Sequence, residues 1–117
     1  MTPATAFKVL TAQQMAVLVR DGSFAGAPVD LADGYIHLST FEQLTETVTR
    51  HFAGQDDLHV AEVDLDALGD AVKWEESRGG QLFPHIYAPL PLPLDAVVAY
   101  GPLHRDDAGR VMRPVAG

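Results

Sequence analysis

The segment DGYIHLST, residues 33–40, places a histidine in the middle of an otherwise apolar stretch. If this stretch is a β-strand, alternate side chains point to opposite faces of the sheet. His37 then shares its face with Tyr35 and Ser39, and the aliphatic residues between them face the other way. The pattern predicts a strand that buries its aliphatic face and turns an imidazole and two hydroxyl groups toward a different environment.

A second segment, FPHIYAP at residues 83–89, repeats this arrangement. The same alternation places His85 and Tyr87 on one face of their strand. A neutral imidazole offers one hydrogen-bond donor and one acceptor, and a hydroxyl can serve as either. Two such pairs suit a polar ligand with ribose-like hydroxyl groups. Together the segments predict a site for a ligand of the size of a sugar or a nucleotide.

Other interpretations of these histidines stay open. Strand histidines are often packing residues, so the alternative is that His37 and His85 are hydrogen-bonded partners in a polar core. The chain has five histidines and sixteen acidic residues, but no two histidines have the four-residue spacing of a helical metal site. Ser39 lacks the G-x-S-x-G sequence of a hydrolase nucleophile. We therefore expect neither a metal site nor a serine hydrolase.

The composition is that of one ordinary globular domain. The chain has 117 residues, of which 47% are hydrophobic and 21% are charged, and this length supports a single core. The absence of cysteine excludes disulfides, thiolate catalysis and thiolate-bound metals. The net charge of −8 argues against binding to duplex nucleic acid, which requires a surplus of basic residues. Glycine-rich phosphate loops of the Rossmann and P-loop types are absent from the sequence.

The chain carries no sign of a membrane partner. No apolar run approaches the roughly 20 residues that span a bilayer. The N-terminal MTPATAFKVL lacks the basic flank, apolar stretch and cleavage site of a secretory signal. We therefore expect a cytoplasmic protein whose partner is a small, nucleotide-like molecule.

A first helix is expected after a strand at Phe7–Leu10. Thr11 can cap this helix while Gln14 reaches back to it, and Val19 is among the apolar residues that we expect to face the core. The chain from Ser23 to Asp33 contains several glycine and proline residues. We expect it to be a loop of the kind that often covers a site.

A second helix is expected after a strand at Tyr35–Ser39. Ser39 or Thr40 can cap it, and Glu42 or Gln43 can complete the capping box. Its apolar residues recur at helical spacing, so one stripe of the helix should be buried against the sheet. These residues are Phe41, Leu44, Val48 and Phe52.

The second half of the chain is mostly strand-like. The expected strands are Leu58–Leu65, Val72–Glu76, Leu82–Ala88 and Ala96–Tyr100. Pro84 lacks an N–H donor, so its strand should be an edge or begin at that residue. Two N-terminal helices followed by four or more strands indicate an α+β fold with a strongly bent, mostly antiparallel sheet. We expect one domain over residues 1–105 and a C-terminal tail over residues 106–117.

Four segments together resemble the DUF952 family of small bacterial and plant proteins. They are DGYIHLST, VTRHF, VKWEE and LFPHIYAPLPL, and the resemblance extends from FKVL to about AYGPL. The family is similar in turn to the ADP-ribosyltransferase fold, a split, bent sheet shared by NAD-dependent toxins, poly(ADP-ribose) polymerases and RNA 2'-phosphotransferases. This resemblance implies an ADP-ribosylation-like fold and makes NAD a candidate cofactor.

The resemblance also implies roles for individual residues. Those enzymes use an HGS or HGT strand motif to hold the ribose beside the nicotinamide, and His37 and Ser39 match it, with Leu38 in place of the glycine. Their later strands supply an aromatic wall and a glutamate that binds the ribose, which makes Glu75 a catalytic candidate beside His37 and His85. Glu75 is equally consistent with a solvated strand end.

The remaining candidates are ligand-binding residues. They are Tyr35, Ser39, Thr40, Arg50, Arg78 and Tyr87, and the two arginines are the candidates for neutralising a pyrophosphate. Three functions follow from these expectations. The first is an enzyme that acts on NAD or on an ADP-ribosylated or phosphorylated substrate. The others are a non-enzymatic module that binds a small ligand, and a polar-core histidine pair with no role in ligand binding.

Overall fold

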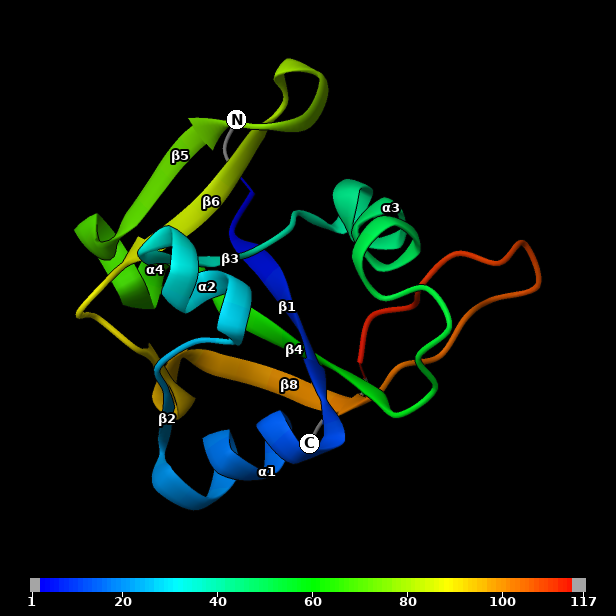
Figure 1. The fold of residues 1–117 in the computed structure, drawn as a ribbon, viewed down its shortest axis with the longest axis horizontal. Coiled ribbons are helices and arrows are strands. Elements are labelled where there is room, and N and C mark those ends of the chain that lie inside the picture. The colour runs from blue at the N-terminus through cyan, green and yellow to red at the C-terminus, as the bar shows by residue number, and fades with distance from the viewer. Residues whose placement is uncertain (1–2, 115–117) are drawn as a thin grey trace.

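Three antiparallel sheets make up the fold, as the computed structural model in Figure 1 shows. The structure describes residues 3–114. The first sheet has the order β1-β4-β8, with β1 Thr5–Thr11, β4 Leu58–Asp64 and β8 Val97–Pro102. The second has the order β3-β6-β5, with β3 Tyr35–His37, β6 Leu82–Tyr87 and β5 Val72–Glu76. A short pair joins β2 Ser23–Phe24 to β7 Leu92–Pro93.

Helices lie between the strands in chain order. They are α1 Ala12–Asp21, α2 Pro28–Asp33, α3 Phe41–His51 and α4 Leu65–Leu68. Short 3₁₀ turns occupy η1 Gly69–Ala71, η2 Arg78–Gly80 and η3 Leu94–Ala96. The expected α+β class with antiparallel sheets is therefore confirmed. The expected number of two N-terminal helices was wrong, because α1, α2 and α3 precede β4.

Both predicted capping boxes are present. The Thr11 hydroxyl accepts a hydrogen bond from the Gln14 backbone N–H (3.1 Å), and the Gln14 side chain accepts one from the Thr11 N–H (3.0 Å). Thr40 and Gln43 make the same exchange at the start of α3, so Thr40 rather than Ser39 is the cap. Such boxes satisfy backbone donors that a helix start leaves unpaired.

The expected loop over Ser23–Asp33 was a wrong prediction, because this segment contains β2 and α2. Pro28 occupies the first turn of α2, and Gly34 ends the helix with a left-handed φ of 87°. The helix has only six residues, too few for an apolar period to show in the sequence. The prediction for α1 was also wrong at Val19, which is 42% exposed.

Pro84 lies inside β6, which begins at Leu82 and is the central strand of its sheet, so the expectation of an edge strand or of a strand that begins at Pro84 was wrong. β3 pairs with β6 only as far as His37 opposite His85. Beyond that pair, the Pro84 carbonyl accepts a hydrogen bond from the Leu38 N–H (3.0 Å). The carbonyl and the nitrogen of one strand residue point to the same side. The missing donor of Pro84 therefore lies on the side of Leu38, the residue after β3, where the pairing of β3 with β6 ends.

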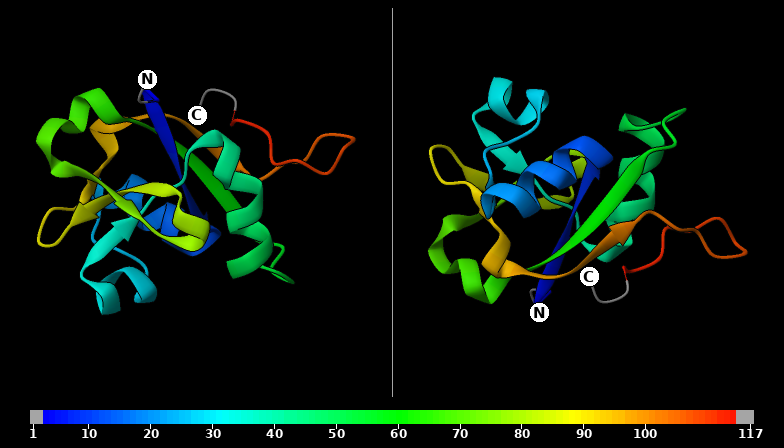
Figure 2. Two further views of the ribbon diagram at one scale, coloured as in Figure 1. Left: turned by 90° about the horizontal axis from the view of Figure 1, so that it is seen from above. Right: turned by 90° about the horizontal axis from the view of Figure 1, so that it is seen from below.

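Two apolar clusters form the core. The larger one lies between the sheets and includes Leu10, Leu18, Ile36 and Ile86. The smaller one joins β1, α3 and the C-terminal tail, because Val111 is buried with Phe7 and Leu44. The Val111 N–H also donates to the Thr45 hydroxyl (2.9 Å). Both views in Figure 2 show the orange and red tail on the α3 side of the molecule.

Candidate functional site

The two histidine strands are neighbours, and their side chains match across the sheet. His37 lies directly opposite His85, and Tyr35 lies directly opposite Tyr87. The residues between them, Ile36 and Ile86, are buried in the core. The predicted alternation is therefore confirmed for Tyr35–His37 and for His85–Tyr87, whereas Ser39 lies beyond the end of β3. It places two imidazoles and two phenols on one face of the β3-β6-β5 sheet.

Three of the rings contact that of Tyr35, and the four residues form what we call the ring cluster, Tyr35, His37, His85 and Tyr87. Tyr35 is central: its ring centroid lies 4.2 Å from that of His85 in a stacked arrangement, 4.7 Å from His37 and 5.0 Å from Tyr87. The two imidazoles are 5.4 Å apart, edge to face. These separations are those of favourable aromatic pairs.

Glu75 on β5 joins the ring cluster from the neighbouring strand. Its carboxylate accepts a hydrogen bond from His85 Nδ1 (2.7 Å), and both of its oxygens accept from the Tyr87 hydroxyl (2.7 and 2.8 Å). The hydrogen bonds from His85 and Tyr87 lower the pKa of Glu75. The bond between Tyr87 and Glu75 also raises the pKa of Tyr87. An ionised carboxylate can only accept, so Nδ1 carries the proton and Nε2 of a neutral His85 is an acceptor.

His37 is held by two carboxylates of α2. Its Nδ1 lies 2.6 Å from Asp30 Oδ1, and its Nε2 lies 2.9 Å from Asp33 Oδ2. The Asp30 side chain is 1% exposed, whereas Asp33 reaches His37 from the solvent side. A ring that donates to both carboxylates carries a proton on each nitrogen. Both ring nitrogens of His37 are thus occupied by carboxylates, whereas Nε2 of His85 has no hydrogen-bond partner among the described residues.

A buried ion pair lies behind His37. Lys8 Nζ on β1 lies 2.9 Å from Asp30 Oδ2, and their side chains are only 6% and 1% exposed. Asp30 also accepts the backbone N–H groups of Ala27 (2.8 Å) and His37 (3.1 Å). Burial alone would raise the pKa of Asp30, but the His37 and Lys8 contacts outweigh it and lower the pKa to about 2. Burial lowers the pKa of Lys8, and Asp30 opposes that shift.

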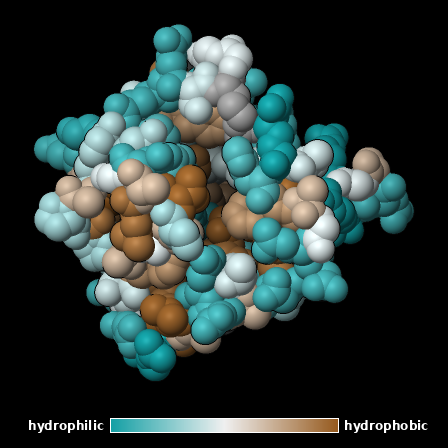
Figure 3. Space-filling model, viewed as in Figure 1, coloured by the Kyte–Doolittle hydropathy of each residue, from teal (hydrophilic) through white to brown (hydrophobic). Residues whose placement is uncertain are grey.

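The helix α2 is arranged inside out. Asp30 is its buried residue, whereas Val29 and Leu31 are 56% and 64% exposed. Figure 3 shows apolar side chains on the part of the surface where Figure 1 places α2. A helix that buries its acid and exposes its aliphatic residues breaks the usual pattern, and such local conflicts are typical of functional sites.

Lys8 and Asp30 were missed by the sequence analysis. Each lies between apolar residues, in FKVL and in VDLA, and a charged residue in an apolar segment is the signal that could have found them. The partner of each charge is 22 residues away in the sequence. The pairing itself was therefore invisible before the fold was known.

Three of the predicted ligand-binding residues, Ser39, Thr40 and Arg50, have other contacts. The Ser39 hydroxyl is paired with the Thr47 hydroxyl (2.7 Å), and the Ser39 backbone pairs with Phe7, so β3 ends before it. Thr40 caps α3, as described above. Arg50 forms an exposed ion pair with Glu46 (2.8 Å). Arg78 lies in η2, and its side chain is outside the described part of the structure.

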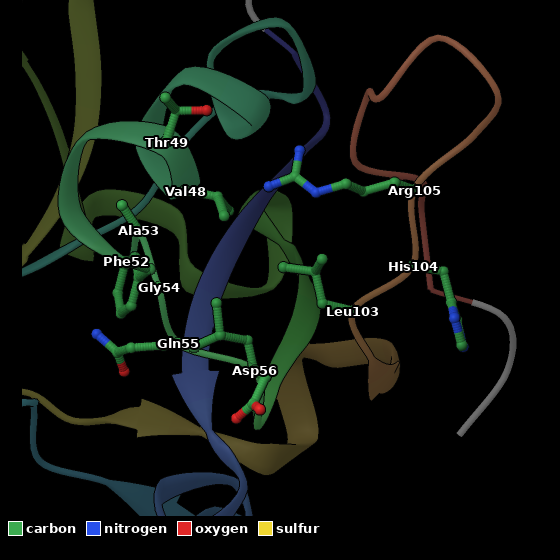
Figure 4. Close-up of a pocket in the computed structure, with 11 residues that line it drawn as sticks. Val48, Thr49, Phe52, Ala53, Gly54, Gln55, Asp56, Leu103, His104 and Arg105 are labelled. Atoms are coloured by element: carbon green, nitrogen blue, oxygen red, sulfur yellow. The ribbon is translucent and has the colours of Figure 1, made fainter.

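A pocket of about 560 Å³ lies away from the ring cluster, between the end of α3, the start of β4 and the segment that follows β8. Val48, Phe52, Leu58 and Leu103 form its apolar lining, and Arg105 points across it in Figure 4. None of the residues that line it belongs to the ring cluster. The ring cluster is an open face instead, on which His37 is 34% and Glu75 41% exposed.

Within residues 3–114, no group of three or more histidine, cysteine or acidic side chains could hold a metal ion. In the same range, none of the helices has the length and apolar character needed to cross a membrane.

The chain is similar to solved structures of protein CC0527 from Caulobacter crescentus. One X-ray structure is 40% identical in sequence, covers 92% of this chain and 93% of that chain, and has a TM-score of 0.82. The solution NMR structure is also 40% identical, covers 92% and 91%, and has a TM-score of 0.76. No curated protein matches the chain. The family described as "Protein of unknown function (DUF952)" matches residues 9–100, and the chain belongs to this family.

Proposed function

We propose that the ring cluster binds a ribose-containing, nucleotide-like ligand, with NAD as the first candidate. The observation that carries this proposal is the placement of two imidazoles, two phenols and a carboxylate on one face of a three-stranded sheet. A packing role does not require this arrangement, because the aliphatic residues of the same strands already fill the core. The polar face of these strands is therefore available to bind a ligand.

The hydrogen-bonding groups of the face suit a ribose-containing ligand. His85 Nε2 is an acceptor when Glu75 holds Nδ1, whereas His37 bonded to two carboxylates is a donor. A ribose hydroxyl can donate to the first ring, and the second ring can donate to a ligand group that replaces Asp33. The Tyr35 and Tyr87 rings offer flat apolar surface beside them, on which a base or a nicotinamide can stack.

The finer form of the proposal is an ADP-ribosylation-like fold with transferase or phosphotransferase activity. It would assign His37 and His85 to the ribose and Glu75 to the positive charge that develops at the anomeric carbon. Both oxygens of Glu75 accept from the Tyr87 hydroxyl, and one also accepts from His85. Catalysis therefore requires Tyr87 to release Glu75 when the substrate binds.

The same contacts favour a second candidate, a binding module without turnover. A carboxylate that is committed to His85 and Tyr87 orients those side chains and need not touch the ligand. In this version Glu75 fixes the acceptor nitrogen of His85 and nothing more. The two candidates differ in whether the bound ligand is cleaved.

The test is incubation of the purified protein with NAD, with thermal unfolding and release of nicotinamide measured together. Stabilisation with nicotinamide release supports the transferase, and stabilisation alone supports the binding module. His37→Ala and His85→Ala should abolish either effect. His51→Ala is the matched control, because His51 is an exposed histidine of α3. If NAD and simpler ribosides leave the unfolding temperature unchanged, the ring cluster is a polar packing arrangement and the proposal is wrong.

A further inference from the structure

A row of three nitrogen-bearing side chains crosses the β3-β6-β5 sheet. His37 lies opposite His85, and His85 lies opposite Lys73 on β5. Residues that are directly opposite in an antiparallel sheet share a face. Lys73 also shares its face with Glu75, two residues on, and Glu75 bonds to His85. Lys73 is therefore on the face of the ring cluster, and we call His37, His85 and Lys73 the nitrogen row.

Lys73 is the member of the row that carries a free charge. Its side chain is exposed and has no ion-pair or hydrogen-bond partner among the described residues. By contrast, Lys8, Arg20, Arg50 and Arg113 are each paired with an acid. The chain has only eight basic residues against sixteen acids. An unpaired lysine beside His85 on this acidic protein marks a place that can accept a negative group.

The other end of the row already holds a negative group. The Asp33 carboxylate lies 2.9 Å from Nε2 of His37, on the solvent side of the ring. Nδ1 is taken by the buried Asp30, so Nε2 is the nitrogen that a ligand can reach. Any ligand atom that binds there must replace Asp33. Because the displaced group is a carboxylate, the position is suited to an anion.

We infer that the two ends of the nitrogen row, His37 and Lys73, bind the phosphate groups of the ligand, and that Asp33 occupies the His37 end until the ligand displaces it. This inference rests on the proposed function for the location of the site and adds the charged part of the ligand. Two strand spacings of ~4.8 Å separate the ends of the row, a span on the order of 10 Å that a diphosphate can bridge with hydrogen bonds from both ends. The ligand class is therefore a nucleoside diphosphate or a dinucleotide.

The experiment is an isothermal calorimetric titration of the full chain with inorganic pyrophosphate at constant ionic strength. Lys73→Gln should weaken binding about fivefold or more, because it removes a charge-assisted hydrogen bond. Asp33→Asn should strengthen binding about two- to fivefold, because an exposed carboxylate no longer competes for His37. Arg110→Gln and Asp107→Asn make the same charge changes on the exposed tail and should change nothing.

Asp33 ends α2, so the folding of Asp33→Asn is checked by its unfolding temperature. If that variant does not fold, Lys73→Gln decides alone, because Lys73 is exposed and bonded to nothing described. Unchanged affinity in Lys73→Gln, or equal loss in Arg110→Gln, overturns the inference. Either result would mean that pyrophosphate binds elsewhere or through net charge.

A second titration with adenosine, which has a ribose but no phosphate, separates this inference from the proposed function. If adenosine binds and pyrophosphate does not, the proposed riboside site is supported and the nitrogen row is not a phosphate site. If pyrophosphate binds in a Lys73-dependent manner and neither adenosine nor NAD binds, the phosphate site is supported and the proposed riboside site is wrong. Absence of binding by all three removes both.

Discussion

The two histidines of the ring cluster are held in opposite ways. His85 is the buried partner of its pair, with a side chain 5% exposed, and its carboxylate Glu75 lies at the surface. His37 is the exposed partner, and its carboxylate Asp30 is buried and neutralised by Lys8. Packing thus fixes the ring of His85, whereas electrostatic contacts fix the ring of His37. We expect changes to the charges to disturb the His37 side far more than the His85 side.

The largest effect should come from Asp30→Asn. This variant leaves Lys8 as a buried charge without its counter-ion, and removal of one partner of a buried pair costs about 3–5 kcal/mol. Lys8→Met should cost less, because Asp30 keeps its hydrogen bonds from Ala27 and His37. Urea unfolding measures both. The exposed pair Arg20–Asp21 is the control, and Asp21→Asn should leave the unfolding midpoint unchanged. Equal costs for all three variants would contradict the contrast.

Acid should weaken the His37 side next. The pKa of Asp30 falls from 3.8 to about 2 on folding. A carboxyl whose pKa is lowered in the folded state stabilises that state above its unfolded pKa, and this contribution disappears as the pH falls through the folded value. The shift corresponds to about 2 kcal/mol, lost between roughly pH 4 and pH 2. Unfolding of Asp30→Asn should lack this component of the pH dependence, and an identical profile for both proteins would argue against it.

The smallest change in stability should come from Glu75→Gln. Glu75 is at the surface, so we expect the unfolding midpoint to stay close to that of the parent protein. The pKa of Tyr87 should fall toward its ordinary value, because the carboxylate that raises it is gone. Ultraviolet titration of the tyrosines reports this shift, and Glu76→Gln on the same strand is the matched control. A Tyr87 that titrates as before would mean that the bond to Glu75 does not persist in solution.

The sequence predicted the part of the site that depends on strand alternation. Period-two patterning places His37 with Tyr35 and His85 with Tyr87 whichever fold they belong to, because it is a property of the extended backbone. The capping boxes at Thr11 and Thr40 were predictable for a similar reason, since a cap and its partner lie three residues apart. Local geometry was sufficient in both cases.

The rest of the site depends on contacts between distant segments. Lys8, Asp30 and His37 come from β1, α2 and β3, and only the fold brings them together. Asp30 lies in a helix of six residues that carries no periodic signal. Pro84 was wrongly expected at an edge, because the point at which β3 leaves the sheet cannot be read from β6 alone.

The reversed burial of α2 has a consequence for how the protein opens. Most short helices are held in place by buried apolar side chains. The buried residue of α2 is instead Asp30, whose carboxylate forms an ion pair with Lys8. The protection of the amide protons of α2 against exchange, relative to their intrinsic exchange rates, should therefore fall as the solution is acidified, while the amides of the central strands remain protected. We therefore expect α2 to detach before the rest of the protein unfolds, and this local opening would expose His37 to solvent.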